Sequence, residues 1–463
     1  MLRVSKFNIY LDMMENDNYL IIQGVRGAFD IVEKSVVEKL EEALLEPDKL
    51  EEIPEDSKNI LIRRGYITNL SEDEEFMFIQ KLSKAINEKG RKHLSITMMP
   101  TYNCNFRCEY CFERNLQKNG VEWLNAKMSP DIVDAVFTQL IKKEKEGYKL
   151  DGIYLFGGEP LLQANKDIVE YICEKAYKLK IPISCISNGY DLDKYIDVVK
   201  EYKFKYIQIT IDGIEEEHDK RRFLLGGQGT YDKIMKNIDL ALNEGIHIVL
   251  RTNVNKKNLD GINKLIELYK ANGWMDKKNF TYYFKSTMKC YDEVEDSLSD
   301  IELMTKLSEI YKEPVSRFQF NSIYHGISDK LLYMLKHNTF APFRSGYCGA
   351  NMGMYTIDPY GDIYPCWDVL AEDENVIGKV DIQRQEFVFN EKLENWKGRT
   401  VDKLKECRNC KYMLFCGGGC SAQAKVLYND INRVFCDDFQ QLFNQVAVDV
   451  CKEHIKNEVV AEN

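Results

Sequence analysis

The chain has 463 residues, enough for about three domains of roughly 150 residues each. Hydrophobic residues make up 44% and charged residues 30%, which excludes general disorder. The net charge of −11 disfavours a nucleic-acid binder, no apolar run is long enough for a membrane helix, and the first residues lack a secretory signal. We therefore expect a cytoplasmic protein with no nucleic-acid and no membrane partner.

Residues 1–90 are predicted to form a separate small module. Strand-like segments surround a turn, and two capping-box patterns indicate helix starts. The expected elements are strands at 7–11 and 19–22 and helices beginning at Ser35, at about residue 55 and at Ser71. This order suits a winged-helix-like fold, which is usually a binding module.

From Leu94 the pattern changes to alternating strands and helices, which predicts an α/β fold with a parallel sheet. Six such units indicate a partial (β/α)6 barrel, similar to an open TIM barrel. We place this barrel at 91–310 and a Gly- and Cys-rich domain at 311–463, ending in a helix over about 437–457. The predicted strands are Leu94–Met99, Ile153–Phe156, Ile183–Ile186, Tyr206–Ile211, Ile246–Asn253 and Phe280–Phe284.

Fourteen cysteines in a large acidic chain indicate metal or redox chemistry rather than disulfides. Cys104, Cys108 and Cys111 follow the first barrel strand with C-x3-C-x2-C spacing. Three thiolates on a short loop can hold three irons of a [4Fe–4S] cluster and leave the fourth iron open for a ligand. The alternative is a closed structural zinc site, which requires a fourth ligand that this loop lacks.

This motif, with Tyr110 before its last cysteine, resembles that of the radical SAM superfamily, and further matches follow successive strands. The resemblance implies that Glu159 accepts from the amino group of S-adenosyl-L-methionine (SAM) and that Arg251 meets its carboxylate. Asp212 also suits a plain turn, and Arg251 also suits a simple salt bridge. The implied SAM contacts are Tyr110, Gly157, Gly158, Glu159, Ser187, Asn188, Asp212 and Arg251.

Seven later cysteines resemble the SPASM extension of radical SAM peptide maturases, which holds two auxiliary iron–sulfur clusters. The resemblance assigns Cys348, Cys366 and Cys420 to the first cluster and Cys407, Cys410, Cys416 and Cys436 to the second. With the SAM-binding cluster this makes three clusters, expected to be [4Fe–4S]. A zinc ribbon on Cys407, Cys410, Cys416 and Cys420 is the alternative, and it leaves the other three cysteines without a role.

Two departures separate the chain from relatives that mature sulfatases. Those relatives place an extra cysteine a few residues after the first cysteine of the extension. In this chain no cysteine lies within a few residues after Cys348. They also place an aspartate, thought to act as a base, where this chain has Trp367. The first auxiliary cluster then has three local ligands, and a substrate thiolate, Cys290 or Asp368 would complete it.

The resemblance implies a radical SAM/SPASM maturase of a ribosomal peptide that cleaves SAM to a 5′-deoxyadenosyl radical and installs an intramolecular thioether. The module at 1–90 resembles a leader-recognition domain, so the implied partners are a precursor peptide with its leader and a one-electron donor such as flavodoxin or ferredoxin. The alternatives are a carbon–carbon cross-linking maturase, an anaerobic sulfatase-maturing (formylglycine-forming) enzyme and a non-catalytic zinc-binding regulator.

Overall fold

The barrel region contains a ten-stranded mixed sheet, and the six strands predicted from the sequence form its parallel part. The computed structural model describes residues 2–14, 17–111, 113–287, 296–312 and 323–462. Six parallel strands run in the order β11-β10-β9-β8-β7-β6. They are β6 (His93–Met98), β7 (Lys149–Leu155), β8 (Ile183–Ser187), β9 (Tyr206–Thr210), β10 (Ile248–Val254) and β11 (Phe280–Ser286). The predicted α/β fold with a large parallel sheet is confirmed.

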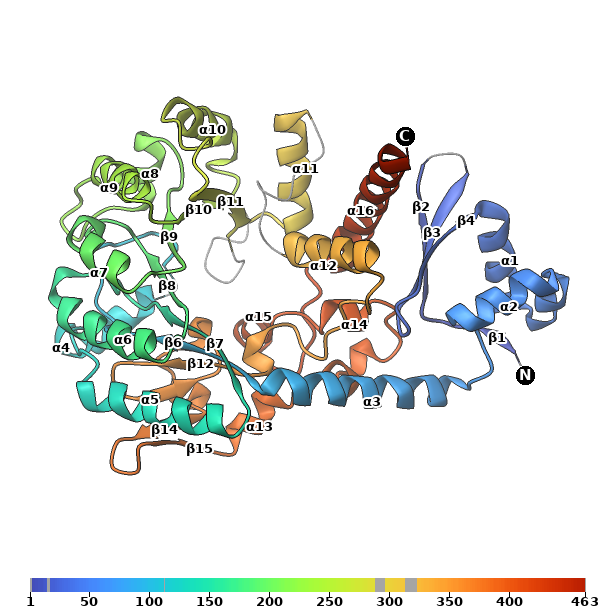
Figure 1. Ribbon diagram of the computed structural model, residues 1–463, viewed down its shortest axis with the longest axis horizontal. Helices are drawn as coiled ribbons and strands as arrows, with labels where there is room; N and C mark the ends of the chain where they lie inside the picture. The colour runs from blue at the N-terminus through green and yellow to red at the C-terminus, as the bar shows by residue number, and fades with distance from the viewer. Residues whose placement is uncertain (1, 15–16, 112, 288–295, 313–322, 463) are drawn as a thin grey trace. The chain divides into compact units, whose positions relative to one another are not determined.

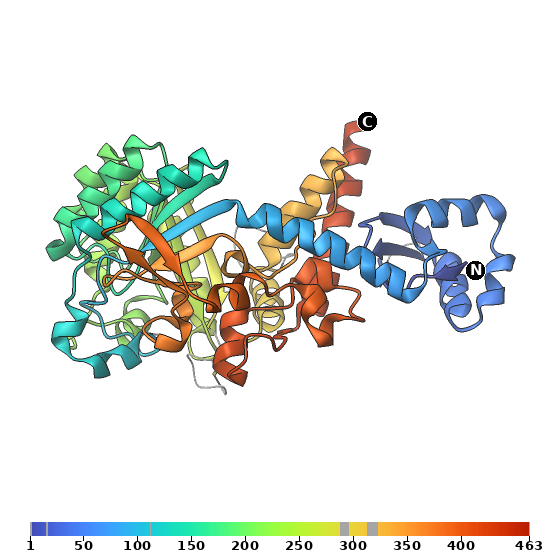
Figure 2. The ribbon, with the colours of Figure 1, turned by 90° about the horizontal axis from the view of Figure 1, so that it is seen from below.

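Helices α5, α6, α7, α9 and α10 run along the outer side of this curved sheet (Figures 1 and 2). Ser129 caps α5, because its hydroxyl accepts from the Ile132 amide at 3.3 Å. Apolar side chains of the helices and strands form the buried core between them. The helices of this region are α4 (Val121–Leu124), α5 (Pro130–Lys145), α6 (Lys166–Lys178), α7 (Ile196–Glu201), α8 (Glu215–Arg221), α9 (Tyr231–Asn243), α10 (Ile262–Ala271) and α11 (Asp300–Tyr311).

The sheet continues beyond the six strands into the C-terminal part of the chain. Strand β12 (Met354–Ile357) pairs in parallel with β6, so that Ser95 lies opposite Met354. An antiparallel extension follows, made of β13 (Asp362–Tyr364), β14 (Gly378–Asp381) and β15 (Glu386–Phe389). Sequence analysis assigned this segment to a separate third domain, but its strands belong to the barrel sheet.

The structure divides into two compact units. One contains residues 90–321 and 349–398, and the other contains residues 1–89, 322–348 and 399–463. The barrel sheet lies wholly in the former, which we call the barrel unit. The latter, which we call the terminal unit, combines the N-terminal module with the end of the chain. Among the described residues, no helix combines the length and apolarity that a membrane span requires.

In the terminal unit, β2 (Asn8–Asp12), β3 (Asn18–Gln23) and β4 (Phe29–Glu33) form an antiparallel sheet, and β1 (Arg3–Val4) pairs with β5 (Ile67–Thr68). The capping box at Ser71 is present, with reciprocal hydrogen bonds to Glu74 at 2.7 and 3.2 Å. The box predicted at Ser35 is wrong, because β4 leads directly into α1 and places Ser35 inside its first turn. The remaining helices of this part are α1 (Lys34–Leu45), α2 (Glu55–Arg64) and α3 (Glu72–Arg91).

The N-terminal module shares a hydrophobic core with the end of the chain. Phe7, Val25 and Ile79 pack in one cluster with Val401 and Leu414. Because both segments contribute to the same core, residues 1–89 are not structurally separate from the cysteine-rich end. The helices of the later segments are α12 (Ile323–His337), α13 (Lys392–Lys397, in the barrel unit), α14 (Met413–Cys416), α15 (Ser421–Tyr428) and α16 (Phe439–Glu462).

Candidate functional site

Three thiols line a cavity of the barrel unit, in the loop that follows β6. Cys104, Cys108 and Cys111 are free and half-exposed. The loop is tightly turned, because the Phe106 amide donates to the Cys104 sulfur at 3.4 Å and the Cys111 amide donates to the Cys108 carbonyl at 3.3 Å. The cavity has a volume of about 1220 Å³. The sequence motif therefore gathers its thiols at one opening, as a shared cluster requires.

The surroundings of these thiols favour their neutral form. Burial raises the pKa of the Cys104 thiol well above its usual value, and the nearby Glu159 carboxylate raises it further. Burial likewise raises the pKa of Cys108, and that of Cys111 to about 12. A coordinating metal deprotonates a thiol outright. The donor set thus fits a bound iron–sulfur cluster, because its positive irons would stabilise the thiolate form that burial disfavours.

Gly157 and Gly158 let the end of β7 approach the cysteine loop closely. A Cβ atom on Gly158 would lie 2.4 Å from the Tyr102 carbonyl oxygen and 2.3 Å from that of Asn103. Gly157 has φ +127°, a conformation that side chains rarely adopt. In this structure the two glycines make room for the cysteine loop, which is a different role from the expected approach to SAM.

Glu159 is buried and joins three segments of the barrel rather than facing the cavity. Its carboxylate accepts from the Leu161 amide at 2.8 Å, the Ser187 hydroxyl at 2.7 Å and the Asn188 amide at 2.6 Å. Burial raises the pKa of this carboxyl to about 7, against the effect of these hydrogen bonds. The Asn188 side chain in turn lies 3.9 Å from the Cys104 sulfur. Glu159, Ser187 and Asn188 therefore form one hydrogen-bonded group that supports the cysteine loop from behind.

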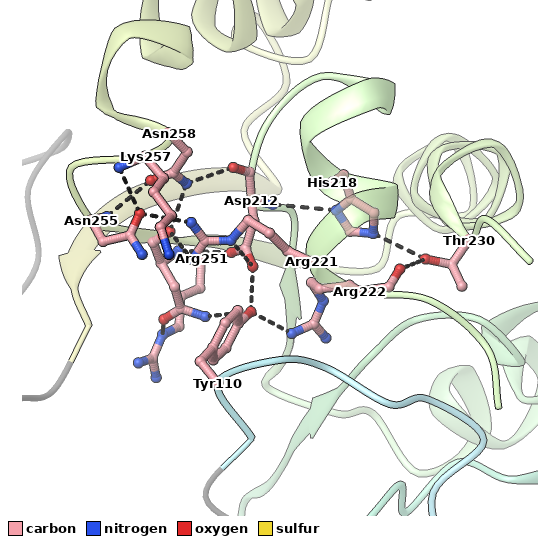
Figure 3. Close-up of polar contacts among 11 residues, drawn as sticks. Tyr110, Asp212, His218, Arg221, Arg222, Thr230, Arg251, Asn255, Lys257 and Asn258 are labelled. Carbon is pink, nitrogen blue, oxygen red and sulfur yellow. Dashed lines mark hydrogen bonds and ion pairs between the residues drawn. The ribbon is translucent and has the colours of Figure 1, made fainter. Parts of the chain in front are cut away.

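Asp212 is the centre of a second polar network, which Figure 3 shows. Its carboxylate, in a residue that is 1% exposed, accepts from the Tyr110 hydroxyl and from the Asn253 amide at 3.0 Å. The Arg221 guanidinium lies 3.6 Å from the same carboxylate. Arg222 donates to the Tyr110 hydroxyl at 2.8 Å. Asp212 does more than form a turn, since this carboxylate offsets the charge of buried cations.

The segment after α8 is clamped onto the cysteine loop. The Arg107 amide donates to the Phe223 carbonyl at 2.8 Å, and the Glu109 amide donates to the Arg221 carbonyl at 3.2 Å. The Arg222 guanidinium lies over the Phe106 ring at 5.7 Å. The loop that carries the thiols is thus held from the end of β9 as well as from β7 and β8.

Charged groups of both signs line the cavity wall away from the thiols. Arg221 and Lys257 contribute cations and Glu217 a carboxylate, of which Oε2 is buried without a hydrogen-bond partner. SAM carries a carboxylate and positive groups, so this wall fits it. Among the expected SAM contacts, Tyr110 lines this cavity, whereas Gly157, Gly158, Glu159, Ser187, Asn188, Asp212 and Arg251 do not.

Arg251 is half-buried on β10, where its Nε donates to the Asn253 side-chain oxygen at 2.8 Å. Lys257, Asn258 and Glu217 were not predicted from the sequence, although they line the cavity. The polar run at 255–258, directly after a buried strand, is the signal that would have indicated two of them.

Comparison with known proteins decides the family of the barrel. Residues 98–269 match the family model described as the Radical SAM superfamily. The barrel is a radical SAM domain. Such a domain uses SAM and a [4Fe–4S] cluster, and the predicted enzyme class is confirmed.

Two relatives illustrate how far the likeness extends beyond that domain. The chain is 26% identical over 374 residues to a cysteine-type anaerobic sulfatase-maturating enzyme of Clostridium novyi (strain NT), covering 76% of this chain and 95% of the relative. It is 24% identical over 336 residues to the antilisterial bacteriocin subtilosin biosynthesis protein AlbA of Bacillus subtilis (strain 168), covering 70% of this chain and 66% of the relative.

Two solved structures share the fold. Native anSMEcpe with bound AdoMet and Cp18Cys peptide aligns with a TM-score of 0.58 and 19% identity, covering 78% of this chain and 99% of that one. Streptococcus suis SuiB bound to the precursor peptide SuiA aligns with a TM-score of 0.50 and 15% identity, covering 94% of this chain and 98% of that one.

Beyond the radical SAM domain, four cysteines gather within the terminal unit. Burial raises the pKa of the Cys407 thiol to about 12, and its neighbours Cys416, Cys410 and Cys436 act in the same direction. The described residues contain no group of three or more His, Cys, Asp or Glu side chains placed to hold one metal ion. A cubane spaces its ligands more widely than a single ion does, because each thiolate binds a different iron.

The three cysteines expected for the first auxiliary cluster come from both units, Cys366 from the barrel unit and Cys348 and Cys420 from the terminal unit. The Asp368 carboxylate lies 3.6 Å from the Cys366 sulfur, and the Asp368 amide donates to that sulfur at 3.5 Å. Trp367 packs against Phe156 with ring centroids 5.5 Å apart.

The remaining cysteines have no place in these sites. Cys173, Cys185 and Cys451 are buried, which fits a role in packing. Cys290, the other candidate to close the first auxiliary cluster, lies outside the described residues.

Proposed function

We propose that this protein is a radical SAM/SPASM maturase of a ribosomal peptide that joins a cysteine sulfur to a carbon of the same peptide. The observation that carries the proposal is a cavity of about 1220 Å³ lined by the three motif thiols. Pockets for a single small ligand usually measure about 300–1,000 Å³. The volume therefore supports a site that takes a peptide segment beside SAM.

When bound, SAM and the cluster held by Cys104, Cys108 and Cys111 supply a 5′-deoxyadenosyl radical. The chain itself positions the reactants and excludes water. Arg221 and Lys257 offer cations to a carboxylate in the cavity. In the overall reaction a hydrogen atom leaves the substrate carbon for 5′-deoxyadenosine, the thiol loses its proton, and one electron leaves when the C–S bond forms.

The seven later cysteines give this electron a destination. We propose that Cys348, Cys366 and Cys420 serve one auxiliary cluster and that Cys407, Cys410, Cys416 and Cys436 serve another. A reduced flavodoxin or ferredoxin supplies the electron for SAM cleavage. The cytoplasm suits these centres, because it keeps thiols reduced.

The open edge of β4 is the proposed binding site for the leader of the precursor peptide. In the described sheet β4 pairs with β3 alone, and none of its five residues is buried. Strand β2, at the other edge, is mostly buried and contacts α16. An added strand would bind β4 through main-chain hydrogen bonds. The relatives named for subtilosin biosynthesis and for a bound precursor peptide support a peptide partner.

The register of β4 identifies the amides that would make these bonds. The Gln23 amide donates to the Ala28 carbonyl and the Lys34 amide to the Asp17 carbonyl, both at 2.9 Å. Because bonded pairs alternate in an antiparallel ladder, Ile31, opposite Leu20, directs its amide away from β3. Ile31→Pro is therefore expected to weaken leader binding at least about fivefold, since one bond worth about 1 kcal/mol is lost. Calorimetry with the precursor peptide measures the change.

Ile31→Thr is the matched control, because threonine keeps both the amide and the branched side chain. It should bind the precursor as wild type does. Equal binding by the proline and threonine variants would rule out strand addition at β4. Deleting the whole module is a poorer test, because Phe7, Val25 and Ile79 share a core with Leu414.

Sulfatase-type maturation is the second candidate function, and it rests on the 26% identity to the Clostridium novyi enzyme over 95% of that relative. Trp367 argues against it, because it stands where those enzymes place an aspartate and its ring packs on Phe156. A carbon–carbon cross-link remains an alternative outcome of the same radical chemistry.

The product distinguishes the candidates. The protein, SAM and a reductant are incubated without oxygen with a cysteine-containing peptide encoded by a neighbouring short reading frame. A thioether maturase yields a peptide that has lost two hydrogen atoms, keeps its sulfur and resists thiol alkylation. A peptide that loses two hydrogens yet still alkylates indicates a carbon–carbon cross-link. Loss of sulfur with a new aldehyde indicates sulfatase-type chemistry.

A further inference from the structure

Arg399 is a buried cation whose hydrogen-bonding groups are all directed at backbone carbonyls. The residue is 2% exposed, within the terminal unit. Its Nη2 donates to the carbonyls of Gly418 at 2.9 Å and Arg433 at 3.0 Å. Its Nη1 donates to the Gly419 carbonyl at 3.2 Å, and its Nε donates to the Ile431 carbonyl. Four of the five N–H groups of the guanidinium thus donate to neutral acceptors.

No carboxylate of the described residues forms an ion pair with this guanidinium. The other two buried arginines of the described chain lie beside the Asp212 carboxylate: Arg221 is 3.6 Å from it, and Arg222 donates to the Tyr110 hydroxyl that donates to it. A buried charge without a counter-charge is costly. Four backbone carbonyls orient the side chain, but they do not neutralise it.

The carbonyls that hold Arg399 lie close in the chain to proposed cluster ligands, because Gly418 and Gly419 stand between Cys416 and Cys420, and Arg433 stands three residues before Cys436. Burial lowers the pKa of its guanidinium, and Cys407, Cys420, Cys348 and Cys416 act in the opposite direction as thiolates. These four cysteines are among the ligands proposed for the two auxiliary clusters. They become anionic when they bind a metal.

We propose that Arg399 is the counter-cation of the auxiliary iron–sulfur centres and raises their reduction potential. The inference rests on the proposed auxiliary clusters. A cubane held by thiolates is an anion that gains one further negative charge on reduction. A fixed positive charge beside its ligands stabilises the reduced form more than the oxidised form, and the effect is strong because the site is buried.

A purely structural role would not need the charge. The turn at Gly417–Gly419 has φ of +78°, +81° and +73°, and a Cβ atom on Gly419 would lie 1.7 Å from the Phe435 carbonyl oxygen. A neutral amide can donate to the carbonyls of such a turn. The reduction potential of the clusters therefore distinguishes a counter-cation from a side chain that only supports the turn, because it depends on the nearby charge.

The test uses the full chain with Cys104, Cys108 and Cys111 replaced by alanine, so that only auxiliary centres remain. The protein is prepared without oxygen, its iron is counted, and the centres are titrated with dithionite under EPR detection. In Arg399→Gln the ratio of reduced to oxidised cluster at a fixed potential should fall at least tenfold, which is about 59 mV for one electron. Arg433→Gln is the control, because its side chain is 57% exposed and paired with Glu406 at 3.2 Å, so its charge is screened.

The outcomes separate this inference from the proposed function. A parent protein without about eight irons, four for each cubane, would remove the auxiliary clusters and the role of Arg399 with them. Full iron with an unchanged ratio in Arg399→Gln would overturn the role of Arg399 alone. If Arg399→Gln loses its iron, Arg399→Lys tests whether the positive charge matters, because lysine keeps the charge without the planar guanidinium. If Arg399→Lys keeps about eight irons and the wild-type ratio of reduced to oxidised cluster, the result supports the proposal. If it keeps the iron but its ratio is tenfold lower, the result contradicts the proposal.

Discussion

Replacing Cys104, Cys108 and Cys111 together by alanine is expected to abolish the formation of 5′-deoxyadenosine. These three thiols line the cavity of the radical SAM domain, and a cubane bound there would lose all its protein ligands. The loss should be complete rather than partial, because SAM cleavage requires an iron to which it binds. Chromatography of an anaerobic reaction with SAM and dithionite measures the product.

Cys173→Ala is the matched control, since this thiol is fully buried in α6 and is not among the residues that line the cavity at the motif thiols. It should lower stability modestly and leave SAM cleavage intact. Iron analysis adds a second readout: the triple variant should lose about four irons, the content of one cubane. Continued cleavage of SAM by the triple variant would mean that the radical site lies elsewhere in the chain.

Asp212→Asn is expected to destabilise the barrel by about 3–5 kcal/mol, the usual cost of breaking a buried ion pair. Asparagine keeps the shape and still accepts from Tyr110, but it no longer offsets the charge of Arg221 and Arg222. Because Tyr110 belongs to the cysteine loop, the loop should also loosen and SAM cleavage should fall steeply. Thermal unfolding and the 5′-deoxyadenosine assay measure the two effects.

Asp358→Asn provides the comparison for a buried aspartate that has no arginine partner. Asp358 is 2% exposed and accepts from the Tyr102 hydroxyl at 2.9 Å. Burial raises the pKa of this carboxyl to about 6, so an amide replaces it at little electrostatic cost. If Asp212→Asn and Asp358→Asn lose equal stability, the charge of Asp212 does not stabilise the polar network around it.

The barrel strands could be predicted from sequence because buried parallel strands are continuous apolar runs between turns. Ile183–Ile186 and Phe280–Phe284 each lie within a strand of the structure. The strands β12 to β15 were missed, since they have three or four residues each and carry no long apolar run. Their place beside β6 depends on a partner far away in the chain, which no local pattern records.

The thiols of the site could be predicted because their spacing is local, whereas the surrounding polar groups could not. Tyr110, Asp212, Arg222 and Asn253 come from separate segments and meet only in the folded barrel. Glu159 was expected to contact SAM, and the structure adds that its carboxylate accepts from two amides and a hydroxyl of the chain, which the motif alone does not reveal. A local motif thus locates a site, whereas the contacts of each side chain depend on segments that are distant in the chain.

The pairing of β12 with β6 also constrains how the chain folds while it is being made. About 260 residues separate Ser95 from its partner Met354, so a ribosome working at about 5–20 residues per second leaves one edge of β6 bare for roughly 13–50 s. An unpaired strand edge is a template for association between copies. A fragment that ends with the sixth barrel strand keeps this edge permanently open. Strand β12 therefore covers an edge at which nascent barrels could associate, so the C-terminal part of the chain does more than supply cysteines.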